Sequence, residues 1–135
     1  MMKTPELYYL ALAAIATLLM WIPYMLARIV TRGPFRTLGD PADPNAPADP
    51  AWATRARRAH ANAVENLAVF APLVVILALT GASTPATVMA SKTYLGARLL
   101  HYIVYAAGIP VIRTLAFAAG FAATFVIAGA VLGRL

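Results

Sequence analysis

The stretch LYYLALAAIATLLMWIPYMLA, residues 7–27, contains 21 residues and no charged side chain, and it decides the class of this protein. A helix of that length is about 31 Å long, at ~1.5 Å per residue, and the hydrocarbon core of a bilayer is ~30 Å thick. Tyr8 stands near one end of the stretch and Trp21 toward the other, where interfacial aromatic residues are expected. The stretch therefore predicts a membrane-spanning helix.

The composition of the whole chain supports the same class. Hydrophobic residues make up 61% of the 135 residues, against roughly 45–50% in soluble proteins, and charged residues make up only 12%. A soluble fold cannot cover its surface with so few charges, and a disordered chain would hold far less apolar surface. The chain has no cysteine, which excludes disulfides, thiolate metal sites and a protein thiol nucleophile. We expect a single integral membrane domain over residues 1–135.

Three further apolar segments follow the first. Asp49 is a candidate N-cap for the second helix, with Pro50 at its first position. The segment 40–50 is rich in proline and acid, so we expect it to be extended. The predicted fold is an all-α bundle of four transmembrane helices, with a loop at 31–50 and spans at about 6–30, 51–80, 85–107 and 111–133.

The formal net charge of +6 bears on orientation. In a membrane protein, a basic excess indicates orientation and contact with anionic headgroups, and no nucleic-acid partner is expected. Lys3, Lys92 and Arg134 fall on one side of the four-span arrangement. By the positive-inside rule, the first loop is cytoplasmic and the termini lie outside. The high alanine content suggests that the membrane is a bacterial inner membrane. The other side carries seven arginines: Arg28, Arg32, Arg36, Arg55, Arg57, Arg58 and Arg113.

Polar residues persist in the second span, where lipid-facing positions should be apolar. Placing an ionisable side chain near the bilayer centre costs roughly 2.5–3.5 kcal/mol, so such residues face other helices or a wet cavity. Arg58, Asn62 and Glu65 stand at i, i+4 and i+7, which is one face of a helix. This spacing predicts a polar face directed into the bundle.

The third span carries a second polar face. Arg98, His101 and Tyr105 stand at i, i+3 and i+7. Depth estimates place the polar faces of the second and third spans in the same leaflet, the cytoplasmic one. Arg28, which ends the first span, and Arg113, which begins the fourth, reach the same level.

Together these residues predict a cationic, water-accessible pocket in which four arginines surround Glu65. An anionic ligand that carries at least one ammonium group would balance the charge. Simpler interpretations remain open for single residues: Glu65–Arg98 as a packing ion pair, His101 as a core histidine and Arg113 as an interfacial, snorkelling arginine. No metal site is expected, because His60 and His101 are the only histidines.

Two sequence blocks resemble the MAPEG family, membrane-associated proteins in eicosanoid and glutathione metabolism. The first is Arg-x-x-x-Asn-x-x-Glu over residues 58–65, at the opening of the second span. The second is ARLLHYIVY over residues 97–105, followed by Arg113-Thr114. The order of the blocks, their depths and the chain length are similar to those of family members, in particular a bacterial relative of the microsomal glutathione transferases.

The resemblance implies a homotrimer of four-helix protomers, with glutathione bound between neighbours as a co-substrate. It implies that Arg58 and Asn62 hold carboxylate or peptide groups of glutathione and that Glu65 takes its ammonium group. Arg113 matches the arginine that stabilises the thiolate in catalytic members. The implied glutathione site is completed by Arg28, Arg98, His101 and Tyr105.

The activity implied is conjugation of glutathione to a lipophilic electrophile, or reduction of a lipid hydroperoxide. Asn66 stands where some members have tyrosine, and Phe117 offers no hydroxyl where prostaglandin E synthases have one, so that particular activity is not expected. Three alternatives stay open from the residues alone. They are a non-catalytic relative that binds an anionic ligand or lipid, a small transporter that uses Glu65, and a structural subunit of a larger complex.

Overall fold

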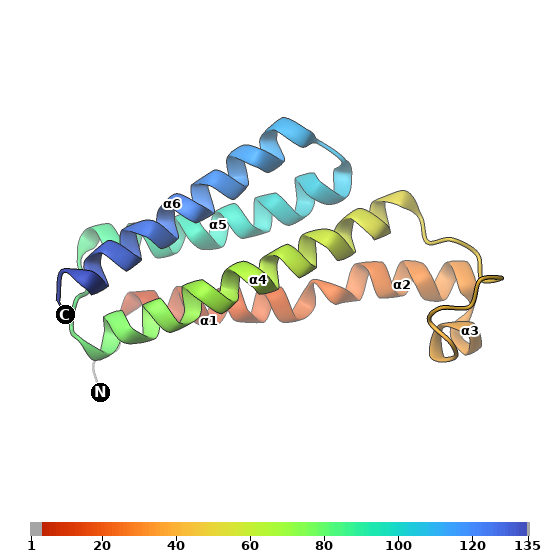
Figure 1. Cartoon of the computed structure of the whole chain (residues 1–135), viewed down its shortest axis with the longest axis horizontal. Helices are drawn as coiled ribbons and strands as arrows, with labels where there is room; N and C mark the ends of the chain where they lie inside the picture. Colours follow the sequence, from red (N-terminus) through yellow and green to blue (C-terminus); the bar gives the residue numbers. More distant parts are fainter. Residues whose placement is uncertain (1–3, 135) are drawn as a thin grey trace.

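A computed structural model of the chain describes residues 4–134, and every regular element within them is a helix. The expected all-α class is confirmed, because the described part of the chain contains no strand. Lys3, one of the charges used to infer orientation, lies outside the described residues. The helices of this part (Figure 1) are α1 (Pro5–Leu19), α2 (Trp21–Arg32), α3 (Pro34–Leu38), α4 (Ala51–Leu79), α5 (Pro85–Ala107) and α6 (Pro110–Leu132).

Three segments of the described chain are long and apolar enough to cross a bilayer, which indicates an integral membrane protein. The first combines α1 and α2 over Pro5–Arg32, and the others are α4 and α6. α5 is as long as α6, at 23 residues, but it is less apolar because it carries Lys92, Arg98 and His101. The structure thus shows three candidate spans and a further helix of span length, where the sequence predicts four spans.

α4 is the helix around which the others pack. It contacts α1, α2, α5 and α6, while α5 packs chiefly against α6 as an antiparallel pair (Figure 1). In the core, Phe70 of α4 stacks on Tyr94 of α5, with ring centroids 3.7 Å apart and planes inclined by 2°. Small side chains allow helices to approach closely in a bilayer. The buried face of the first half of α4 consists of alanines: Ala53, Ala56, Ala59 and Ala63.

The first span is interrupted near its middle, which the sequence analysis does not predict. α1 ends at Leu19 and α2 begins at Trp21. Pro23 has no N–H to donate to the carbonyl four residues earlier, so the hydrogen-bond ladder of one continuous helix cannot be complete there. Tyr102 Oη donates to the Met20 carbonyl at 2.8 Å, which ties the interruption to α5.

The first loop differs from its prediction in two places. It contains the short helix α3, although residues 40–50 are non-helical as expected. Asp49 is not the N-cap of α4: that position belongs to Pro50, and it has no side-chain cap. Asp49 instead binds Arg28 and Arg32 of α2, because two nearby guanidinium groups are better partners for a carboxylate than backbone N–H groups.

The turn between α5 and α6 brings the polar residues of both helices together. Gly108 ends α5 in the left-handed conformation, with φ 79°, which costs glycine nothing. Pro110 then opens α6 at a position where a missing N–H does no harm. Because the turn is so short, Arg113 on the first turn of α6 lies beside Tyr105 on the last turns of α5.

Candidate functional site

Arg98 is the residue at which three helices meet. Its side chain, which begins on α5, is only 3% exposed. Nη1 donates to Asn62 Oδ1 of α4 at 3.2 Å, and Nη2 donates to the Phe117 carbonyl of α6, also at 3.2 Å. The two polar faces expected from the sequence therefore touch, through Arg98 and Asn62.

The Arg98 guanidinium is buried and pairs with no carboxylate of the described residues. It lies over the rings of Tyr94 and Phe117, at 5.6 and 5.4 Å from their centroids, and the electron-rich faces of these rings partly replace a counter-ion. Its Nε is buried and has no hydrogen-bond partner within residues 4–134. A buried cation in this condition is costly and retains the capacity to bind an anion.

Gly120 of α6 provides the space that Arg98 occupies. A Cβ atom built on Gly120 would overlap the guanidinium group, including its Nε and Cζ atoms. The position of the arginine therefore depends on the absence of a side chain on the neighbouring helix.

A cavity of about 260 Å³ lies between the end of α5 and the beginning of α6. The His101 and Tyr105 rings meet edge to face, 5.5 Å apart, and His101 is buried. Arg113 lies with its Cζ 4.6 Å from the centroid of the Tyr105 ring. Thr114 and Phe117 complete the lining. The structure thus brings His101, Tyr105 and Arg113 together.

The polar face of α4 lies at the surface of the single chain. Arg58 and Glu65 are exposed, and Asn62 is half-buried. Within residues 4–134 both ion pairs involve Asp49, so no arginine pairs with Glu65. The expected ring of arginines around Glu65 is therefore not formed within one protomer.

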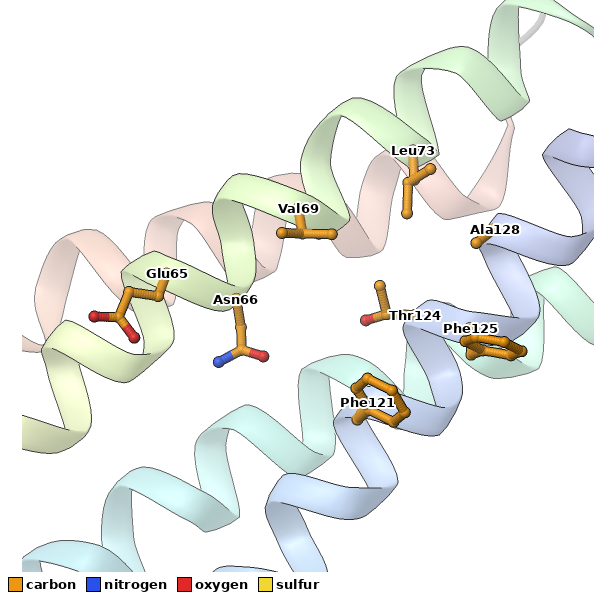
Figure 2. Close-up of a pocket in the computed structure, with 8 residues that line it drawn as sticks. All are labelled: Glu65, Asn66, Val69, Leu73, Phe121, Thr124, Phe125 and Ala128. Atoms are coloured by element: carbon orange, nitrogen blue, oxygen red, sulfur yellow. The ribbon is translucent and has the colours of Figure 1, made fainter.

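Glu65 and Asn66 stand at the polar end of a second cavity, of about 380 Å³, between α4 and α6. Figure 2 shows Val69 and Leu73 of α4 facing α6 across this cavity. Phe121 and Phe125 of α6 line the opposite wall, with Thr124 and Ala128 beside them. Phe117, Phe121 and Phe125 recur every four residues, which places them along one side of α6; Phe117 lines the first cavity and the other two line the second. The second cavity is suited to an apolar chain with a polar group at one end.

Arg28 does not join the other predicted site residues within the chain. Its Nε donates to both carboxylate oxygens of Asp49, at 3.2 and 3.0 Å, and its Nη2 donates to Oδ2 at 2.5 Å. Arg32 reaches the same carboxylate at 3.2 Å. The hydrogen bonds from Arg28 hold the pKa of the Asp49 carboxyl below its ordinary value, and the positive charges nearby act in the same direction.

Polar contacts that the sequence analysis missed lie outside this region. Glu6 of α1 is fully buried, and its Oε1 accepts hydrogen bonds from Thr87 Oγ1 at 2.5 Å and Ser83 Oγ at 2.8 Å. Tyr24 Oη and His60 Nδ1 lie 2.8 Å apart between α2 and α4. Glu6 could have been recognised from the sequence, because it is an acidic residue directly before an apolar run. Gly120 gave none, because glycine is common in membrane helices.

Comparison with known proteins adds one finding to this geometry. The model of the MAPEG family matches residues 7–133, which is nearly the whole chain. A search of curated proteins found no significant match.

Proposed function

This chain belongs to the MAPEG family, and we propose that it is a membrane-embedded, glutathione-dependent transferase or peroxidase that acts on lipophilic electrophiles. Membership is consistent with glutathione-related or eicosanoid metabolism at a membrane. The observation that carries the proposal is the buried Arg98 guanidinium, which donates to Asn62 at 3.2 Å and has no carboxylate partner in the part of the chain that the structure describes.

The residues present fit glutathione, a tripeptide with two carboxylates, one ammonium group and one thiol. Arg98 has an unused buried donor at Nε, and Asn62 adds an amide beside it. Arg58 and Glu65 lie on the same face of α4, so a cation for a carboxylate and an anion for the ammonium group are both present. His101 and Tyr105 would form the wall of the site on α5.

Arg113 is the proposed catalytic residue. A thiol with a pKa near 8.5 is mostly protonated at neutral pH, and an adjacent guanidinium favours the reactive thiolate. The Tyr105 ring holds Arg113 at the edge of the cavity on α6. With an aryl halide as acceptor, the sulfur–carbon bond forms as the carbon–halogen bond breaks. Halide leaves, and the thiol proton passes to solvent.

The lipophilic acceptor would lie along the phenylalanine row of α6. The row begins at Phe117, which lines the cavity of Arg113, and continues through Phe121 and Phe125 into the larger cavity. Holding two reactants side by side in this way accounts for much of the rate that an enzyme gains.

A homotrimer is part of the proposal. Glu65 and Arg58 are exposed in a single chain, and Arg28 is turned to the loop. A neighbouring protomer would cover the face of α4 and contribute cations near Glu65. We further propose that α5 also crosses the membrane, as the third of four spans, that residues 1–135 form one domain and that the first loop faces the cytoplasm of a bacterial inner membrane.

Isothermal titration of the detergent-solubilised protein with glutathione tests the binding site. Arg98→Gln and Glu65→Gln are expected to weaken binding by about tenfold or more, which corresponds to ~1.4 kcal/mol. Arg36→Gln is the matched control, because Arg36 is exposed on α3, away from both cavities. Equal affinities for all four proteins would contradict the site.

Arg113→Ala separates chemistry from binding. It is expected to abolish the ultraviolet thiolate absorbance that appears when glutathione is added, and to reduce turnover of an aryl halide more than glutathione affinity. Unchanged absorbance and turnover would overturn the catalytic role.

A non-catalytic binding protein is the second candidate. It is favoured by the departure at Phe117, which offers no hydroxyl near Arg113. This candidate predicts saturable binding of glutathione, or of an anionic lipid, without a thiolate signal.

A further inference from the structure

Residues 30–38, the segment that comprises the end of α2 and all of α3, carry the most exposed large apolar side chains of the described chain. Phe35, Val30 and Leu38 are 89%, 86% and 84% exposed, more than any other large hydrophobic residue within residues 4–134. All three lie within nine residues of one another, immediately after or at the end of the first candidate span. Exposed apolar side chains concentrated in one short segment indicate contact with a non-aqueous environment, such as a membrane or a partner protein.

The bundle does not supply that environment. Among the helices, α3 contacts only α2. In Figure 1, α3 lies on the side of α2 that faces away from α4, beyond the turn that joins α5 to α6. Gly33, with φ 81°, ends α2 and redirects the chain into α3. The segment therefore projects sideways from the end of the bundle.

The charges beside these apolar residues complement an anionic surface. Arg36 is exposed on α3 and has no carboxylate partner within residues 4–134. Arg32, in contrast, is paired with Asp49, and this pair fixes the end of α2 against the start of α4. Arg57 and Arg58, at the same end of the bundle, are also exposed. Anionic lipid headgroups attract basic residues near a bilayer surface.

We infer that α3 and the last turn of α2 lie in the bilayer interface. Val30, Phe35 and Leu38 would insert at the boundary of headgroups and acyl chains, with Arg36 at the level of the lipid phosphates. An apolar side and a basic residue are the features by which helices lie on a membrane surface. The segment would then hold the end of the first span at a fixed depth.

Depth measurement by spin labelling tests this inference directly. The chain has no cysteine, so a nitroxide attaches only where a cysteine is introduced. Phe35→Cys and Leu38→Cys report on the apolar side, and Asn45→Cys is the matched control, exposed in the same loop. The full-length protein is placed in nanodiscs that contain anionic phospholipid, and collisions with oxygen and with a water-soluble nickel chelate are compared.

Labels at 35 and 38 are expected to show a several-fold higher ratio of oxygen to nickel collisions than the label at 45. The replaced side chains are exposed, so the variants should fold, and each position gives an independent result. Equal ratios at all three positions would place α3 in water. Labels at 35 and 38 that are immobilised and shielded from both reagents would instead indicate a protein–protein contact. Either result overturns the inference.

The effect of the Arg36 charge on the depth of α3 is measured separately. In discs with anionic lipid, Arg36→Gln is expected to make the label at 38 shallower, and in purely zwitterionic discs it should have no effect. The same depth in both proteins and both lipids would overturn the role of Arg36, whatever the depth of Phe35.

Discussion

Arg98 and Asn62 are 36 positions apart in sequence and joined by a hydrogen bond of 3.2 Å between Nη1 and Oδ1. This contact connects the polar face of α4 to that of α5 and lies beside the aromatic ring of Phe117. The pair carries a full positive charge and no negative one.

Asn62→Asp should stabilise the protein and weaken its ligand binding. The new carboxylate has the shape of the amide and would pair with the buried guanidinium, adding about 1 kcal/mol to the free energy of unfolding. It would also occupy the charge that an anionic ligand needs, so glutathione affinity should fall by about tenfold or more. Thermal melting and calorimetric titration measure the two effects. Asn45→Asp, which adds the same charge in the loop, should change neither. Undiminished affinity in Asn62→Asp would show that Arg98 does not hold the ligand.

Gly120→Ala should destabilise the bundle through a single methyl group. The added Cβ would overlap the Arg98 guanidinium, and moving a buried cation or its helix costs about 1–3 kcal/mol. Gly129→Ala is the control on the same helix, because a Cβ there has no atom within 4 Å. Alanine favours helix over glycine by up to about 1 kcal/mol, so the control should be neutral or stabilised. Chemical unfolding in detergent gives both values, and equal effects would refute the close packing of Gly120 on Arg98.

The ion pairs of Asp49 with Arg28 and Arg32 should make the stability of the protein sensitive to acid. Because hydrogen bonds from Arg28 lower the pKa of Asp49 in the folded protein, its stabilising effect is complete above the unfolded pKa of about 3.9. The effect is lost as the pH falls through the lowered folded pKa. As the pH is lowered from 5, the melting temperature should therefore fall more steeply in wild type than in Asp49→Asn. Asp40→Asn, altered at an exposed carboxylate in the same loop, should follow wild type. If melting temperature varies with pH in the same way in wild type and in Asp49→Asn, the ion pairs of Asp49 do not stabilise the folded protein.

Glu6 should tolerate glutamine but not alanine. Glutamine keeps a side-chain oxygen that can accept hydrogen bonds from Ser83 and Thr87, whereas alanine leaves both hydroxyls without it and opens a cavity. Losing a buried acceptor and its volume costs roughly 2–4 kcal/mol. Unfolding titrations of Glu6→Gln and Glu6→Ala make the comparison. If the two variants lose the same stability, the hydrogen bonds at Glu6 contribute little.

The helices follow largely from residue type, and the exceptions have local causes. A charge-free run of span length located α6, Pro50 indicated where α4 begins, and Gly108 with Pro110 marked the turn between α5 and α6. The interruption at Met20 was missed because a proline within an apolar run does not show whether a bilayer helix continues through it. α3 was missed because five residues are too few to show a helical period.

The candidate site was predictable where spacing along one helix decides it. Arg98, His101 and Tyr105 share a face of α5, and a short turn brings Arg113 to them. Which carboxylate pairs with which arginine was not predictable, because several carboxylates compete for the same arginines. Arg28 was assigned to a ligand, yet Asp49, 21 residues later, binds it in the structure. The space at Gly120 depends on helix packing, which no residue pattern encodes.

The stack of Phe70 on Tyr94 has a consequence for permeability. These rings, with Val74 and Leu77, are at most 1% exposed and belong to one packed core cluster, which separates Arg98 from Glu6. Water or an ion moving along the axis of the bundle would have to separate these closely packed side chains.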